Sequence, residues 1–248
     1  MLIIPQPVLA MITPDIAFVR KPLNSTPGFD SFFDVYTIDI NGGNLVRLTN
    51  NNYAELDPIF SPTDDLLSFY SNPLGTIGGG VFRMNFDGSD VQELSGAGGG
   101  YEQSWSPDGT KLVFSKPNST LGDTDLYIVN KDGSGLVKIS QDDGQHLAPK
   151  WSPAGDHIAY VSITGTHIVD TDGLNKVTVS SDSDYHALWS PDGTKLYFSN
   201  EGGLWSVHPD GTGATKIWSL PDPDFFAAFR IKALTSDGKT LVFTDKSS

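Results

Sequence analysis

The sequence predicts an all-β fold made of repeated antiparallel units in a single domain. Three observations support this: one turn motif recurs along the chain, a second turn signal falls between its copies, and no stretch shows helical periodicity. The 26 glycines and 16 prolines are dispersed through the 248 residues, which indicates many tight turns. A chain of this length is within reach of one all-β repeat domain.

The first motif reads Trp-Ser-Pro-Asp-Gly and is followed by a β-rich run. Its copies begin at Ile12, Phe60, Trp105, Trp151, Trp189 and Leu234, and those that begin with Trp are the clearest. The third residues of the copies lie at positions 14, 62, 107, 153, 191 and 236, so neighbouring copies are 38 to 48 residues apart. Six copies at this spacing match the period of a four-stranded propeller blade.

The second signal is an Asp-Gly or Asn-Gly turn between two short β-rich runs. These turn segments begin at Asp39, Asn85, Asn130, Asp170 and His208. Glycine accepts the positive φ that a tight hairpin turn requires, so each segment predicts a hairpin. In the third unit, strands are expected over residues 103–106, 111–115, 125–130 and 136–140. Each unit is therefore expected to be a four-stranded antiparallel blade.

The prediction is a six-bladed β-propeller over residues 1–248. Its blades are expected at about 7–50, 57–95, 102–140, 147–180, 186–219 and 228–245, with residues 1–6 added to the last blade. The sixth blade is incomplete, because only three residues follow its strand at 241–245. An N-terminal strand at Leu2-Ile3-Ile4 is expected to complete it, which closes the ring and covers a free edge. Deletion of residues 1–6 should then lower stability and promote self-association.

These repeats resemble the WD40-like PD40 repeat, which is typical of the TolB-type six-bladed β-propeller. The resemblance covers residues 7–245. The repeat is also similar to those of propellers attached to prolyl-oligopeptidase-like peptidases and of oligogalacturonate lyases, so it indicates a fold more than a function. TolB resembles this chain only in its propeller, because the family's N-terminal α/β domain has no counterpart in the sequence. The resemblance implies a periplasmic or secreted protein, and a cytoplasmic one is the alternative because no signal peptide is visible.

Composition excludes several functional classes. The chain has 16 Lys and Arg against 30 Asp and Glu, a net charge of −14, whereas nucleic-acid binding requires clusters of basic residues. No apolar run approaches the roughly 20 residues that span a bilayer. There is no cysteine, so thiolate chemistry is excluded. No hydrolase, zinc-protease, P-loop or dinucleotide motif occurs, so no catalytic residue and no cofactor are predicted. The protein is expected to be a monomer.

Function is expected where the repeats differ. The loops between the second and third strands vary most: they span about 21–34, 72–80 and 116–124 in the first three blades, but only 163–165 and 200–203 in the next two. These loops and the blade-to-blade connections share one side of the ring, here called the loop face. The uniform Trp-Ser-Pro-Asp-Gly and Asp-Gly turns share the opposite side, the turn face. Loops on a rigid scaffold are common binding sites.

Polar and aromatic residues at the start of the inner strands are expected to line the channel mouth on the loop face. They are Tyr53, Glu55, Asp57, Tyr101, Glu102, His146, Tyr185, His186 and Arg230. Asp57, Glu102 and His186 fall three residues before the motif's aromatic residue, and Glu55 and His146 fall two further out. Such a set could hold a divalent metal or a polar ligand, and the tyrosines could stack on a sugar or peptide. The alternative is a solvated rim with ordinary hydrogen bonds, in which the tyrosines act as packing spacers.

An aromatic patch is expected where the first and last blades meet. It would consist of Phe29, Phe32, Phe33, Phe225 and Phe226, and its alternative role is a plug of the channel mouth. The favoured function is a non-catalytic propeller that binds a protein or peptide on the loop face. One alternative is a carbohydrate-binding or lyase-like propeller that uses the channel mouth, with or without a divalent metal. Another is an engineered or excised propeller with no present partner.

Overall fold

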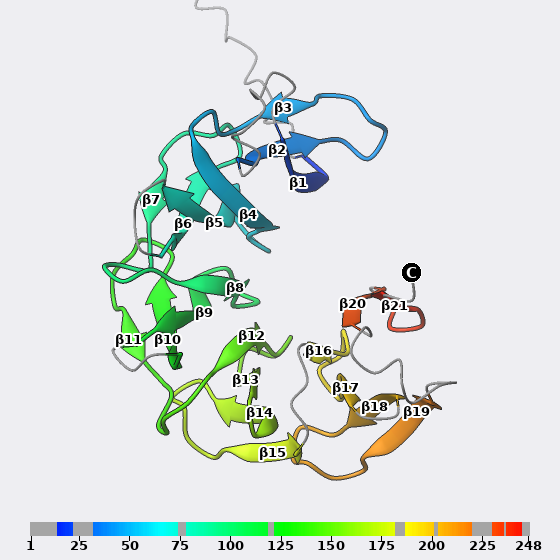
Figure 1. Ribbon diagram of the computed structural model, residues 1–248. Coiled ribbons are helices and arrows are strands. Elements are labelled where there is room, and N and C mark those ends of the chain that lie inside the picture. Colours follow the sequence, from blue (N-terminus) through cyan, green and yellow to red (C-terminus); the bar gives the residue numbers. More distant parts are fainter. Residues whose placement is uncertain are drawn as a thin grey trace, which may run out of the picture.

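The computed structural model describes residues 14–21, 32–73, 78–118, 122–181, 187–200, 203–219, 230–235 and 237–244. The regular secondary structure within these ranges consists of β-strands, and neighbouring strands of each sheet are antiparallel. The sheets follow one another round an arc in chain order, with β4, β8, β12, β16 and β20 nearest the centre (Figure 1). In the described ranges, no helix could cross a membrane. The prediction of an all-β fold is confirmed.

Four of the sheets contain four strands in the described residues. The second blade has β4 (Tyr53–Phe60), β5 (Leu66–Pro73), β6 (Gly80–Asn85) and β7 (Gln92–Glu93). The third has β8 (Tyr101–Trp105), β9 (Lys111–Pro117), β10 (Thr124–Asn130) and β11 (Val137–Lys138). The fourth has β12 (Leu147–Trp151), β13 (His157–Ser162), β14 (Gly165–Asp170) and β15 (Val177–Ser180). The fifth has β16 (Ala187–Trp189), β17 (Leu196–Asn200), β18 (Gly203–Val207) and β19 (Thr215–Ser219).

The two ends of the arc have fewer described strands. The first sheet contains β1 (Ile16–Arg20), β2 (Asp34–Ile38) and β3 (Val46–Arg47). Because β1 follows the first copy of the turn motif, it corresponds to the second strand of the other blades. The last sheet is the hairpin of β20 (Arg230–Leu234) and β21 (Leu241–Thr244). The N-terminal strand expected to close the ring lies outside the described residues, so closure as six blades stays a prediction.

The repeated turn motif is held together by its own side chains. In the third blade, Asp108 Oδ1 accepts hydrogen bonds from the Ser106 hydroxyl at 2.6 Å, the Thr110 amide at 3.0 Å and the Thr110 hydroxyl at 2.9 Å. The fourth blade has Ala154 at the place of the aspartate, and Asp156 accepts from the motif's serine instead, at 2.8 Å. A carboxylate therefore closes the turn in both blades, which gives the aspartate a structural role.

The core consists of clusters that lie between successive blades. One cluster joins Val81 and Leu94 of the second blade to Trp105 and Phe114 of the third. The indole of Trp105 also donates a hydrogen bond to the carbonyl of Ile59 at 3.2 Å. The motif's tryptophan thus packs between neighbouring blades, and a buried aromatic residue of this kind contributes much of the core's apolar area.

Candidate functional site in the central channel

The inner strands share a bulge at the position where the sequence predicts channel-mouth residues. The register between the first two strands shifts in the second, third and fourth blades. Within each bulge, the residue three before the motif's aromatic residue has a left-handed φ, which is +50° at Asp57, +57° at Glu102 and +50° at Ala148. Ala148 has no functional group, so the bulge is a property of the repeat. The carboxylates of Asp57 and Glu102 therefore occupy a position that the repeat itself creates. A bulge turns a side chain in a direction that it would not have in a regular strand.

Neighbouring bulges are bonded to each other. The side-chain amide of Gln103 donates to the carbonyl of Asp57 at 2.7 Å. The backbone amide of Ala148 donates to Glu102 Oε2 at 2.6 Å. A hydrogen bond to a charged acceptor is stronger than one between neutral groups, so this contact fixes the Glu102 carboxylate against the fourth blade.

A pocket of about 410 Å³ opens beside these bulges. It is lined by Val19, Asp57, Pro58, Ile59, Glu102, Gln103, Ala148 and Lys150. These residues belong to β1, β4, β8 and β12, three of which are innermost strands of the arc (Figure 1). The volume lies in the range of small-molecule sites, and its polar groups are two carboxylates, one amide and one ammonium. This pocket is the strongest candidate for a functional site.

Lys150 is a member of this pocket that the sequence analysis missed. Burial lowers the pKa of its ammonium, while the negative charges of Glu102 and Asp57 oppose this shift. A signal for it exists in the sequence. Lys150 directly precedes the motif's Trp151, a place that Ile59 and Ser104 hold in the two preceding blades. A charged residue there distinguishes the fourth blade from its neighbours.

Glu55 lies in the interior rather than in this pocket. It is 1% exposed, and its Oε1 accepts hydrogen bonds from the Asn51 side chain at 2.8 Å and the Ser71 hydroxyl at 3.2 Å. Its Oε2 has no hydrogen-bond partner among the described residues. Burial raises the pKa of Glu55, and the hydrogen bonds from Asn51 and Ser71 only partly offset this.

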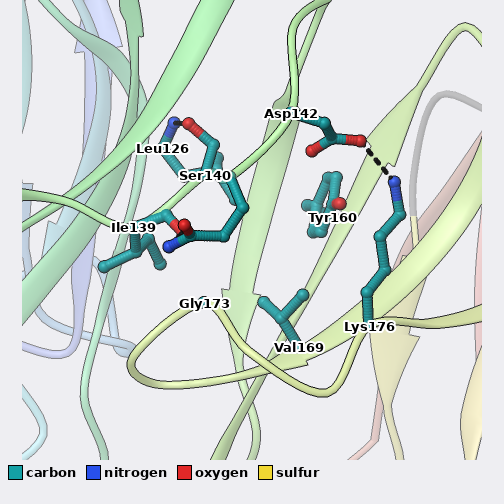
Figure 2. Close-up of a pocket in the computed structure, with 9 residues that line it drawn as sticks. Leu126, Ile139, Ser140, Asp142, Tyr160, Val169, Gly173 and Lys176 are labelled. Atoms are coloured by element: carbon teal, nitrogen blue, oxygen red, sulfur yellow. Dashed lines mark hydrogen bonds and ion pairs between the residues drawn. The ribbon is translucent and has the colours of Figure 1, made fainter.

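His146 is also buried away from the central pocket. Its Nδ1 lies 2.7 Å from the carbonyl oxygen of Thr124 and its Nε2 lies 3.0 Å from Asp142 Oδ1. A smaller pocket of about 200 Å³ lies close by, between the third and fourth blades. Asp142 Oδ2 lies 2.7 Å from the ammonium of Lys176. Figure 2 shows this ion pair beside Tyr160.

The charges of this smaller pocket neutralise one another. Burial disfavours ionised Asp142, but the hydrogen bonds from Lys176 and His146 outweigh it and lower the pKa of Asp142 to about 2. Burial raises the pKa of the Tyr160 hydroxyl, so this group stays protonated. Because its acid and base already pair with each other, this pocket is a weaker candidate than the central one.

The aromatic members of the predicted channel mouth are only partly covered by the structure. Tyr53 is 38% exposed at the start of β4. Tyr101 is half-buried, and burial raises the pKa of its hydroxyl. Tyr185 and His186 lie outside the described residues, and Arg230 is described only as the first residue of β20. The described residues contain no group of three or more His, Asp or Glu arranged to hold a metal.

The predicted aromatic patch is likewise described in part. Phe32 and Phe33 are half-buried at the end of the first long loop. Phe33 pairs with Ala54 of the second blade through an isolated bridge, and the ammonium of Lys21 lies 5.7 Å from the centre of its ring. Phe29, Phe225 and Phe226 lie outside the described residues.

Comparison with known proteins identifies the class of fold. No protein-family model matches the chain. An uncharacterized protein of Agrobacterium fabrum is 30% identical over 142 residues, which cover 53% of this chain and 48% of that protein. A TolB homolog of Chlorobium luteolum is 30% identical over 134 residues, which cover 53% of this chain and 29% of that protein. The chain thus matches about half or less of the length of these relatives.

Solved structures agree on a β-propeller. TolB from Acinetobacter baumannii superposes with a TM-score of 0.60 at 13% identity, over 87% of this chain and 60% of that one. An oligogalacturonate lyase in complex with manganese superposes with a TM-score of 0.64 at 19% identity, over 85% of this chain and 64% of that one. At these identities the likeness shows the fold alone. Together with the TolB homolog, it establishes a TolB-like propeller fold.

Proposed function

We propose that this chain is a non-catalytic β-propeller that binds a protein or peptide partner on its loop face. The contrast between the two faces carries the proposal. On the turn face, equivalent turns repeat one set of hydrogen bonds from blade to blade. On the loop face, the connection from β9 to β10 spans residues 118–123, whereas that from β13 to β14 has only residues 163–164. Variable loops on a uniform scaffold are typical of binding sites.

The proposal includes the finer features that the sequence predicts. The ring would have six blades of PD40 repeats, with residues 1–6 completing the last blade, and would act as a monomer. The TolB-like fold supports a protein partner, and the resemblance to TolB-type propellers supports a periplasmic or secreted location. No resident cofactor is proposed.

Selection of peptide ligands tests the binding function. The full chain would serve as bait for a displayed library of random peptides, and the selected peptides would be titrated against variants of each face. Tyr53→Ser on the loop face should weaken binding about tenfold, or about 1.4 kcal/mol. The matched variant Lys195→Ala, at an exposed position of the turn face, should leave binding unchanged. Peptides that respond only to Lys195→Ala would contradict the assignment of the loop face.

The phenylalanine patch has its own test. If Phe32 and Phe226 dock the partner, Phe32→Ser and Phe226→Ser should abolish peptide binding and change the free energy of unfolding by less than about 1 kcal/mol. If they plug the channel, each change should cost about 3 kcal/mol or more. A response of neither binding nor stability would show that the patch does not exist as proposed.

A second candidate function is carbohydrate binding or lyase-like chemistry. The two carboxylates and the amide of the central pocket favour it, because such groups bond sugar hydroxyls. The structural likeness to an oligogalacturonate lyase solved with manganese suggests a version of this function that depends on a divalent metal. Titration with manganese or calcium tests that version, since a site in the folded state must raise the melting temperature. No shift at micromolar metal would remove it.

A further inference from the structure

Lys150 differs from four other lysines of the described residues in how its charge is satisfied. Lys116 donates to the carbonyls of Ser95 and Ala97, each at 2.7 Å. Lys131, Lys138 and Lys176 each pair with an aspartate at 2.7 to 2.8 Å. The ammonium of Lys150, within the described residues, has neither a hydrogen bond nor an ion pair. An amine without a partner inside a pocket is available to a ligand.

The pocket around Lys150 combines apolar walls with oxygen acceptors. Val19, Pro58, Ile59 and Ala148 form the walls. Gln103 is 1% exposed, and its Oε1 has no hydrogen-bond partner among the described residues. The carboxylates of Asp57 and Glu102 also line the space. These acceptors suit hydroxyl groups, whereas the two negative charges disfavour an anionic ligand.

The protonation of Lys150 supports a chemical role. Burial lowers the pKa of the ammonium, although Glu102 and Asp57 act in the opposite direction. A lower pKa increases the fraction of neutral amine near neutral pH. Lysines in such surroundings act as nucleophiles toward carbonyl groups.

We infer that Lys150 forms an imine with a small, neutral hydroxyaldehyde or hydroxyketone bound in the central pocket. A volume of about 410 Å³ accommodates such a molecule. The ligand's hydroxyls donate to Gln103 Oε1 and to the carboxylates, and its carbonyl carbon faces the amine. This inference concerns the channel and does not depend on a protein partner at the loop face.

The reaction balances without an oxidant or a cofactor. The lone pair of the neutral amine attacks the carbonyl carbon, a C–N bond forms, and the carbonyl oxygen becomes a hydroxyl. The hydroxyl takes its proton from the amine. The nitrogen then loses its one remaining proton as the C–O bond breaks, and the oxygen leaves with both protons as one water molecule. The carboxylate of Asp57 has no hydrogen bond within the described residues, so it is free to take the amine's proton and return it to the departing hydroxyl. Glu102, held by the Ala148 amide, acts on the site through its charge.

Reductive trapping tests this inference. The full chain would be incubated with glycolaldehyde and cyanoborohydride, which converts an imine into a stable secondary amine, and peptide mass spectrometry would locate the label. Lys150 should be labelled several times faster than the exposed Lys111 at neutral pH, because burial lowers the pKa of its ammonium and leaves more of the amine neutral. The rate at Lys150 should also reach its plateau at a lower pH than the rate at Lys111.

Matched variants complete the test. Lys150→Arg and Lys150→Met should each remove the fast label, with circular dichroism confirming the fold, and Lys111→Arg should retain it. Asp57→Asn should slow labelling at Lys150 but not at Lys111. Equal rates at the two lysines, or a rate at Lys150 that Asp57→Asn leaves unchanged, would overturn the inference.

Discussion

The turn face and the central channel are built from the same repeat, yet their polar groups are satisfied differently. On the turn face, Asp108 and Asp192 each accept three hydrogen bonds from their own turns. In the channel, Asp57 and Lys150 have side chains without a hydrogen bond in the described part of the chain, and Glu102 has one from a backbone amide. Groups that are satisfied within the chain contribute stability, whereas groups left open in a pocket are available to a ligand. Substitutions on the turn face should therefore change stability without changing binding.

The largest effect is expected at Gly173, in the turn between β14 and β15. Its φ is +82°, and an added Cβ would lie 1.8 Å from the carbonyl oxygen of Ile139 in the third blade. Gly173→Ala should therefore cost about 3 kcal/mol or more of unfolding free energy in urea denaturation, because the two blades must separate.

Gly42→Ala is the matched control for this change. Gly42 has a similar φ of +84°, but no atom lies within 4 Å of the added Cβ. The control isolates the cost of the left-handed backbone, about 1 kcal/mol. Equal losses of unfolding free energy in the two variants would show that the close contact between the blades at Gly173 adds nothing to the cost of the substitution.

A smaller loss is expected when the turn loses its carboxylate. Asp108→Ala removes three hydrogen bonds within one turn and should cost about 1–2 kcal/mol. Ala154→Asp places the motif's aspartate in the fourth blade, where Asp156 already bonds the serine, and should change stability by less than about 0.5 kcal/mol. Thermal and urea unfolding of both variants provide the measurement. A larger effect from Ala154→Asp than from Asp108→Ala would refute the structural role given to this carboxylate.

Acid should destabilise the fourth blade through His167. This side chain is 1% exposed and contacts the hydroxyls of Ser162, Thr164 and Thr178. Burial, followed by the positive charge of Lys176, lowers the pKa of His167 to about 4, while Asp142 opposes the shift.

Between pH 6.5 and 4 the unfolded chain therefore binds a proton that the folded chain does not, so stability falls as the pH falls through this window. His167→Gln should flatten the decline in melting temperature over that window by a few degrees. The control variant His208→Gln, at an exposed position, should leave this decline unchanged. A wild-type melting temperature that stays constant from pH 6.5 to 4 would contradict the assignment.

The sequence predicted the blades well because their signals are local. The motif's turn closes through side chains within five residues of one another, and Trp105 packs between blades where the period places it. The channel was predicted only in part. Regular strand alternation puts Glu55 and Asp57 on the same side, but the bulge after Leu56 separates them, so Asp57 reaches the pocket and Glu55 enters the interior. A bulge depends on pairing between strands, which a single sequence does not display.

The smallest predicted effect is a gain in stability rather than a loss, and it concerns Glu55. Burial raises the pKa of this carboxyl, and the negative charge of Asp34 adds to the shift, while hydrogen bonds from Asn51 and Ser71 lower it. The folded state thus binds more protons than the unfolded state around and above pH 4.5, the ordinary pKa of a glutamate side chain. The contribution of Glu55 to stability is therefore greatest in acid and is lost as the pH rises through its folded pKa.

Glu55→Gln should consequently raise stability at pH 7, by less than about 1 kcal/mol after solvent screening, and have no effect near pH 4. The amide keeps an oxygen to accept from Ser71, and it removes the buried charge whose second oxygen has no described partner. Thermal unfolding at the two pH values measures the difference, with Asp65→Asn at an exposed position as the matched control. A loss of stability at pH 7 would mean that the Glu55 carboxylate is ionised and satisfied in the folded protein. The interior beside the channel would then follow the same rule as the turn face, in contrast to Asp57 and Lys150 in the central pocket.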